Sequence, residues 1–138
     1  MVNGYFDILF VYMILNPRTL IMKRILIIED EDRVRKIYAQ LLTDEGFEVI
    51  ESADASEAYD VLNKGGIDLV LLDIKMPVVF GSILYEIMQS FHNKVKVIVS
   101  SVYPLDEQKR IVKGAIDYHD KSHGTQLLLE KVRKALAE

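Results

Sequence analysis

The chain has 138 residues, enough to bury one sizeable core, and half of them are hydrophobic while 28% are charged. This composition excludes a chain that is disordered along its whole length. The net charge is −4 and the basic residues are scattered, so the sequence does not predict the concentrated basic surface that nucleic-acid binding requires. The chain has no cysteine, which excludes disulfides, thiol nucleophiles and thiolate metal sites and suits a cytoplasmic location.

Residues 1–22 form an apolar extension that differs from the rest of the chain. The run from Tyr5 to Leu15 is strongly apolar, but it is interrupted by Asp7 and is shorter than the roughly 20 residues that span a bilayer. It lacks the basic segment and the small-residue cleavage site of a signal peptide. Three interpretations are open: an upstream extension that the fold does not need, a packing or dimerising segment, and a membrane-surface anchor.

Residues 23–138 alternate short apolar runs with amphipathic stretches. The first run, Ile25 to Ile28, is continuous and bounded by charge, which is typical of a strand buried on both faces. The predicted elements are, in chain order, strand 25–28, helix 32–45, strand 47–50, helix 53–64, strand 67–72, helix 82–91, strand 95–99, helix 106–113, strand 115–118 and helix 124–137. Five such pairs in series predict an α/β domain with a parallel sheet covered by helices on both faces.

The residues that suggest chemistry follow the apolar runs. In an open parallel sheet, ligands bind beyond the carboxyl ends of the strands. The residues expected there are Glu29, Asp30, Asp73, Ser101 and Lys121. Three carboxylates that converge at one edge repel one another, and a divalent cation is the simplest compensation. Carboxylates with a backbone carbonyl suit a hard cation such as Mg²⁺.

Simpler and competing interpretations explain these residues less well. Acids before a helix can cap it, and Asp32 is expected to do so, but Glu29 and Asp30 stand directly after the strand, where no cap is needed. The glycines of a P-loop or of a dinucleotide fingerprint are missing there. His92 and His119 have no second histidine at ligand spacing, so structural or solvated roles are expected for both.

A carboxylate nucleophile is the interpretation that survives for Asp73. An Asp-x-Asp phosphohydrolase would carry an acid at position 75, which is lysine. Asp73 is therefore expected to attack a phosphoryl group. A metal ion would neutralise the phosphoryl oxygens, while Lys121 would pair with one of them and Ser101 would donate a hydrogen bond to another.

Four stretches resemble the receiver domain of bacterial response regulators, of the single-domain chemotaxis or sporulation type, and the resemblance covers nearly all of the chain after Met22. They are residues 25–31 (ILIIEDE), 68–77 (DLVLLDIKMP), 97–101 (VIVSS) and 114–121 (GAIDYHDK). The resemblance implies a flavodoxin-like fold with strand order 2-1-3-4-5 and a receiver domain over residues 23–138.

The resemblance also implies a metal site for Mg²⁺ or Mn²⁺ around the phosphoacceptor. Asp73 resembles the phosphoacceptor itself. Asp30, Asp73 and the backbone carbonyl of Lys75 resemble the direct metal ligands, and Glu29 resembles the acid that acts through water.

Further residues resemble the parts of the family that respond to phosphorylation. Ser101 resembles the switch hydroxyl, Tyr118 the aromatic residue that rotates with it, and Lys121 the lysine that pairs with the phosphoryl group. Lys75 and Tyr103 occupy the positions that influence the lifetime of the phosphoryl group. Tyr103 is expected to shield it from water, and Lys75 either bridges to Glu29 or is an isolated surface lysine.

The resemblance implies partners rather than ordinary enzymatic turnover. The donor would be a sensor histidine kinase or a histidine phosphotransfer protein. The output would pass through the face formed by the fourth helix, fifth strand and fifth helix to an unknown downstream protein or a separate output domain, and a homodimer is possible. Self-catalysed phosphorylation and dephosphorylation would be slow. The alternative is a degenerate receiver that acts as a phosphorylation-independent binding or dimerisation module.

The sequence departs from the family pattern at two places. Ser122 follows Lys121 where the family usually has proline after a cis bond, so the geometry of this bond is left open. The loop 77–81 (PVVFG) is apolar where the family's loop is glycine-rich and acidic. Two interpretations of the loop are tight packing on the third helix and a docking patch for a partner.

Overall fold

The computed structural model describes residues 4–15, 22–75 and 81–137. Within the apolar loop 77–81, only Gly81 belongs to the described residues. The two interpretations of that loop therefore fall outside them and stay predictions.

The five strands form one parallel sheet in the order β2-β1-β3-β4-β5. The strands are β1 (Arg24–Ile28), β2 (Glu48–Ser52), β3 (Leu69–Leu72), β4 (Lys96–Ser101) and β5 (Asp117–Asp120). The helices are α1 (Gly4–Leu15), α2 (Asp32–Asp44), α3 (Ala55–Lys64), α4 (Gly81–Phe91), α5 (Leu105–Ile111) and α6 (Thr125–Leu136), with a 3-10 turn at Lys121–His123. The predicted fold class and strand order are confirmed.

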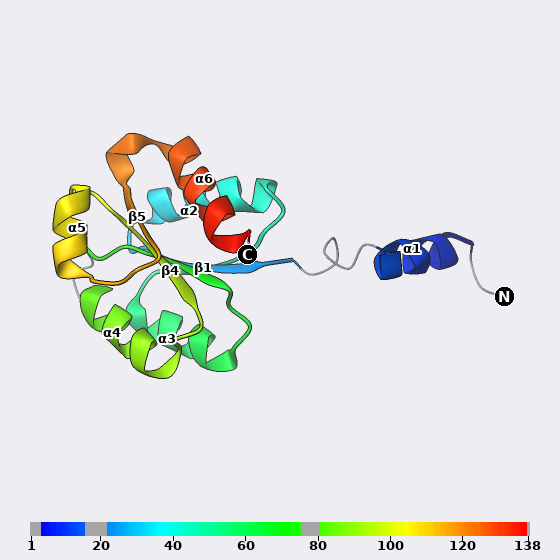
Figure 1. Cartoon of the computed structure of the whole chain (residues 1–138), viewed down its shortest axis with the longest axis horizontal. Coiled ribbons are helices and arrows are strands. Elements are labelled where there is room, and N and C mark those ends of the chain that lie inside the picture. Colours follow the sequence, from blue (N-terminus) through cyan, green and yellow to red (C-terminus); the bar gives the residue numbers. More distant parts are fainter. Residues whose placement is uncertain (1–3, 16–21, 76–80, 138) are drawn as a thin grey trace.

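Helices cover both faces of the sheet (Figure 1). Side chains alternate along each strand, so Ile25 and Ile27 of β1 pack with residues of α2 and α6, while Leu26 and Ile28 pack with residues of α3 and α4. The middle strands β1, β3 and β4 are therefore buried on both faces, which is why they appear in the sequence as continuous apolar runs.

The fifth strand lies two residues later than predicted, at Asp117–Asp120 instead of 115–118. Its sequence is polar, so an apolar run does not mark it. Its position is set by backbone pairing with β4, in which Ile98 lies opposite Asp117 and Ser101 lies opposite Asp120. Lys121 consequently follows the strand directly, at the same edge of the sheet as the ends of β1 and β3.

His119 of β5 is buried, with 1% of its surface exposed. Neither ring nitrogen has a hydrogen-bond partner within the described part of the chain. Burial lowers the pKa of this imidazole to about 4, and the positive charge of Lys131 and the neighbouring His123 add to this effect against the weaker opposite influence of Asp120 and Asp117. The role of His119 is thus structural rather than solvated.

From Ile8 to Leu15, helix α1 presents its apolar side chains to solvent. The eight residues from Ile8 to Leu15 are between 36% and 72% exposed. The helix lies away from the sheet and its covering helices (Figure 1). No described helix has the length and apolarity that spanning a membrane requires.

Replacing His119 by leucine should flatten the loss of stability in acid. The unfolded chain binds a proton on this residue near pH 6.5, and the folded protein does so only near pH 4. Protonation of the unfolded chain therefore lowers the free energy of unfolding as the pH falls through that interval. The loss of stability that His119 causes reaches about 3 kcal/mol by pH 4. Urea unfolding at a series of pH values should show a shallower slope for His119→Leu and no loss of stability at pH 7. His123→Gln removes an exposed histidine that makes a smaller contribution to this shift, so its slope should differ from the parent's by less than that of His119→Leu. A His119→Leu slope equal to the parent's would contradict the assignment.

Removing residues 1–21 should leave the fold intact. Because the apolar side chains of α1 are exposed, their removal takes away little buried surface, and the free energy of unfolding should change by less than about 0.5 kcal/mol. Urea unfolding of the full and shortened chains measures this change. A larger loss would show that the extension packs on the domain. If the full chain sediments as an oligomer and the shortened chain as a monomer, the extension is instead a self-association segment.

Candidate functional site

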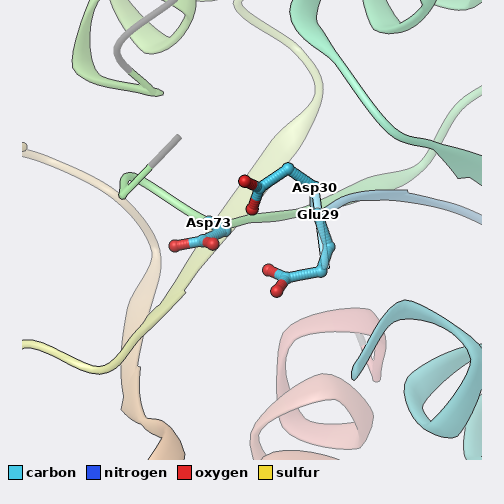
Figure 2. Close-up of side chains that lie close together, drawn as sticks. All are labelled: Glu29, Asp30 and Asp73. Carbon is cyan, nitrogen blue, oxygen red and sulfur yellow. The ribbon is translucent and has the colours of Figure 1, made fainter. Parts of the chain in front are cut away.

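Three carboxylates meet at the carboxyl edge of the sheet. Ile28 and Leu72 lie opposite each other at the ends of β1 and β3, so the next residues, Glu29 and Asp73, are neighbours. The Asp73 amide donates to the Ile28 carbonyl at 3.0 Å, which continues the ladder to Asp73. Glu29, Asp30 and Asp73 each have a carboxylate oxygen within 4.8 Å of those of the other two (Figure 2). The predicted convergence is therefore present.

The cluster is buried on one side and open on the other. Glu29 and Asp73 are 2% and 5% exposed, while Asp30 is exposed to solvent. Burial and the nearby Asp73 carboxylate raise the pKa of Glu29 to about 8, although Lys121 acts in the opposite direction. The pKa stays raised even beside Lys121, so this single ammonium group offsets only part of the cost of the buried negative charge. A cation entering from the Asp30 side would reduce this cost.

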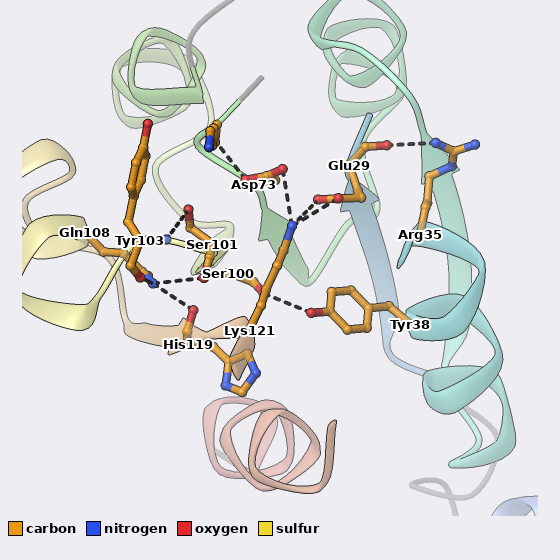
Figure 3. A network of polar contacts seen from close by, with 11 residues as sticks. Glu29, Arg35, Tyr38, Asp73, Ser100, Ser101, Tyr103, Gln108, His119 and Lys121 are labelled. Carbon is orange, nitrogen blue, oxygen red and sulfur yellow. Dashed lines mark hydrogen bonds and ion pairs between the residues drawn. The ribbon is translucent and has the colours of Figure 1, made fainter. Parts of the chain in front are cut away.

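Lys121 supplies a positive charge inside the cluster. Its Nζ lies 3.0 Å from each carboxylate oxygen of Glu29 and 3.4 Å from Oδ2 of Asp73 (Figure 3). Burial lowers the pKa of Lys121, but the carboxylates of Asp73 and Glu29 outweigh this effect and the pKa is raised. The lysine is therefore an ammonium ion that approaches the carboxylate of Asp73.

The turn after Lys121 is held by hydrogen bonds of Asp120. The structure has no cis peptide bond among its described residues, so the Lys121–Ser122 bond is trans. The Asp120 carboxylate accepts from the Ser122 amide at 2.8 Å and from its hydroxyl at 2.7 Å, which caps the 3-10 turn that begins at Lys121. Ser122, unlike a proline, provides both of these donors.

Ser101 is the last residue of β4 and is fully buried. Its Oγ accepts a hydrogen bond from the Tyr103 amide at 3.2 Å. The Lys75 ammonium lies over the ring of Tyr103, 5.6 Å from its centroid, and the Lys75 amide donates to Oδ1 of Asp73 at 2.9 Å. Lys75 thus contacts the Tyr103 ring, while the Glu29 carboxylate is paired with Lys121.

Tyr118 is bound to the segment that follows α5. Its hydroxyl donates to the Val112 carbonyl at 2.7 Å and accepts from the Ala115 amide at 3.2 Å. The side chain is half-buried and packs against the core cluster on the α3 and α4 face of the sheet. Rotation of the ring, as expected for the switch aromatic, would break both of these hydrogen bonds.

Buried polar side chains of α2 support the site and were not predicted. Arg35 donates to the Glu29 carbonyl at 2.8 Å, pairs with Asp32 at 2.5 Å and approaches Glu51 at 3.4 Å. Asp32 is therefore the partner of Arg35 in the first turn of α2, and it is not the capping residue. Arg35 and Tyr38 lie on the buried face of the helix, whereas Ile37 is 47% exposed. Their spacing of three residues is the signal that could have identified Arg35.

Tyr38 reaches beneath the site from α2. It is buried, and its hydroxyl lies 3.5 Å from Oγ of Ser100 (Figure 3). Burial raises the pKa of Tyr38, so the residue is neutral next to Lys121.

Gly81 brings α4 into contact with the backbone of Asp73 and Ile74. A Cβ atom at Gly81 would lie 2.6 Å from the Asp73 carbonyl oxygen and 2.5 Å from Cα of Ile74. Both distances are shorter than atoms tolerate, so only glycine allows this approach.

The donor set fits a hard divalent cation. Carboxylate oxygens are preferred by Mg²⁺, which binds a few protein ligands and keeps several waters. Glu29, Asp30 and Asp73 provide such oxygens within reach of one ion, and the exposed Asp30 leaves room for water. The contribution of the Lys75 carbonyl stays a prediction.

The sequence model of the response regulator receiver domain matches residues 25–133. The chain is 33% identical to the chemotaxis protein CheY of Treponema pallidum over 82% of each chain, and 27% identical to sporulation initiation phosphotransferase F of Bacillus subtilis over 83% of this chain and 94% of the other. Among solved structures, it is similar to the response regulator TrrA of Thermotoga maritima in complex with Mg²⁺-BeF. That structure has a TM-score of 0.77 and 32% identity over 83% of this chain and 100% of the other.

A second solved structure holds TrrA in complex with the histidine kinase ThkA, with a TM-score of 0.73 and 32% identity over 83% of this chain and 99% of TrrA. The strand order β2-β1-β3-β4-β5 agrees with the fold of these similar structures. The chain belongs to the response regulator receiver domains, the signalling phosphoacceptors of two-component systems.

Proposed function

We propose that this receiver accepts a phosphoryl group on Asp73 in a reaction that depends on Mg²⁺ or Mn²⁺, and that it switches the binding of a downstream partner. The observation that carries the proposal is the contact of one ammonium group, that of Lys121, with both Glu29 and Asp73 at the edge of the sheet. A sensor histidine kinase or histidine phosphotransfer protein is the donor. The complex of the similar TrrA with a kinase supports this class of donor.

The transfer is an exchange of one bond to phosphorus. A carboxylate oxygen of Asp73 attacks the phosphorus atom of a phosphohistidine, the P–O bond forms, and the P–N bond breaks with its electron pair on the imidazole nitrogen. Asp30, Asp73 and the Lys75 carbonyl would hold Mg²⁺, with Glu29 acting through water, and the ion would neutralise charge on the phosphoryl oxygens.

Lys121 and Ser101 respond to the new charge. The phosphoryl group carries about two negative charges over three acceptor oxygens. Lys121, which now shares its ammonium between Glu29 and Asp73, pairs with one phosphoryl oxygen, and the Ser101 hydroxyl donates to another. The Tyr103 amide loses its present acceptor when the Ser101 hydroxyl moves.

The output passes through the face formed by α5, β5 and α6. Movement of the Ser101 to Tyr103 segment allows Tyr118 to turn inward, and this changes the surface that the downstream protein contacts. The phosphoryl group is later lost by slow self-catalysed hydrolysis.

Asp73→Ala should abolish phosphorylation. Intact-mass spectrometry after incubation with acetyl phosphate should show a single phosphoryl adduct on the parent with Mg²⁺ and none without it, because Asp73 is the nucleophile and the metal neutralises the donor. The variant should show no adduct, and Asp60→Ala, which removes an exposed acid of α3, should behave like the parent. A folded parent that takes up no phosphoryl group would support the degenerate receiver.

Tyr103→Ala should shorten the life of the phosphorylated form several-fold. The ring, held under the Lys75 ammonium, is expected to shield the acyl phosphate from water. The decay of the adduct after removal of the donor measures this lifetime. Tyr59→Ala, which removes an exposed tyrosine of α3, is the matched control. Loss of the phosphoryl group at the parent's rate would refute the shielding role.

A further inference from the structure

Gln108, in the middle of α5, connects the Ser101–Tyr103 segment to β5. Its side chain is fully buried, and its Nε2 donates to the Tyr103 carbonyl at 2.7 Å and to the His119 carbonyl at 2.9 Å. The Ser101 carbonyl lies at 3.4 Å from the same nitrogen (Figure 3). One carboxamide therefore bonds the backbone of the segment that follows β4 and the backbone of β5.

The orientation of this carboxamide follows from its partners. All three neighbours are carbonyl oxygens, which accept hydrogen bonds, so the NH₂ group must face them and the oxygen must point away. In that orientation Oε1 of Gln108 receives no hydrogen bond from any residue that the structure describes. The side chain thus places two donors well and leaves its acceptor unsatisfied inside the protein.

The two short bonds of Gln108 end on different backbone segments. His119 lies within β5, which is fixed by its pairing with β4, where Ser100 is opposite His119. Tyr103 lies in the segment after β4, whose amide is bound to Oγ of Ser101. When the Ser101 hydroxyl turns toward a phosphoryl group, the Tyr103 segment shifts relative to β5, and Gln108 cannot keep both short bonds.

We propose that Gln108 is a latch, a positioning residue that holds the Ser101–Tyr103 segment in its unphosphorylated place by bonding Tyr103 and His119 at once. The inference rests on the proposed function, because it needs a phosphoryl group to open the latch. The bonds that Gln108 makes stabilise the resting arrangement and oppose the switched one, so the residue sets how readily the receiver responds to phosphorylation.

The test compares the parent with Gln108→Met. Methionine has a similar shape and removes both the donors and the unsatisfied oxygen, so the buried packing is retained. The probe is BeF with Mg²⁺, the pair bound in the TrrA structure, which stands in for the phosphoryl group. Loss of the latch should tighten the apparent binding of BeF in the presence of Mg²⁺ by roughly fivefold, while binding of Mg²⁺ alone stays at the parent's level.

The control and a measurement on the parent keep the test decisive. Gln89→Met, on the exposed side of α4, should leave BeF binding unchanged. In the parent, NMR of the Gln108 side-chain amide should show slow exchange with solvent at rest and faster exchange once Mg²⁺ and BeF are added. This second measurement also decides the matter if Gln108→Met does not fold.

Three outcomes would overturn the latch, and they separate it from the proposed function. Unchanged or weaker BeF binding by a folded Gln108→Met, or a side-chain amide that stays equally protected in the parent, refutes the latch alone. If the parent is nevertheless phosphorylated on Asp73, the proposed function still holds although the latch is refuted. A parent that binds no BeF and takes up no phosphoryl group refutes both.

Discussion

The contact of the Lys121 ammonium with two buried carboxylates is the interaction on which the site depends. Glu29 and Asp73 stand next to each other because β1 and β3 are paired to their last residues, and burial makes their shared negative charge costly. Lys121 compensates only part of it, since Asp30 adds a third carboxylate at the open side. The site can therefore bind a further cation at its carboxylates, and it can bind an anionic group that pairs with Lys121 in their place.

The parts of the site that stand at strand ends could be predicted from the sequence. A parallel sheet brings its carboxyl ends to one edge whatever the details of packing, so Glu29, Asp30, Asp73 and Lys121 are placed by chain order alone. The same reasoning gives the fold class, because three strands are continuous apolar runs. It fails by two residues for β5, whose polar sequence is placed by backbone pairing and not by burial.

The supporting residues could not be predicted in the same way. Gln108 and Arg35 are long polar side chains on helices, and their partners are backbone carbonyls or acids brought near by the tertiary fold. The spacing of Arg35 and Tyr38 could have placed Arg35 on the buried face of its helix, but no spacing identifies the partners of Arg35 or Gln108. The position of Lys75 over Tyr103 likewise depends on the tertiary fold. Sequence order therefore indicates the reacting groups, and tertiary packing determines what holds them.

The close approach at Gly81 makes the two sides of Asp73 different: the backbone is tightly packed on the α4 side and less constrained on the α5 side. On the α4 side, the helix begins against the backbone of Asp73 and Ile74 with no space for even a methyl group, so helix and strand end must shift as one body or not at all. On the α5 side, the Ser101–Tyr103 segment is held by a few hydrogen bonds, which can be exchanged. A phosphoryl group on Asp73, as proposed, would therefore act in one direction, away from α4 and toward α5.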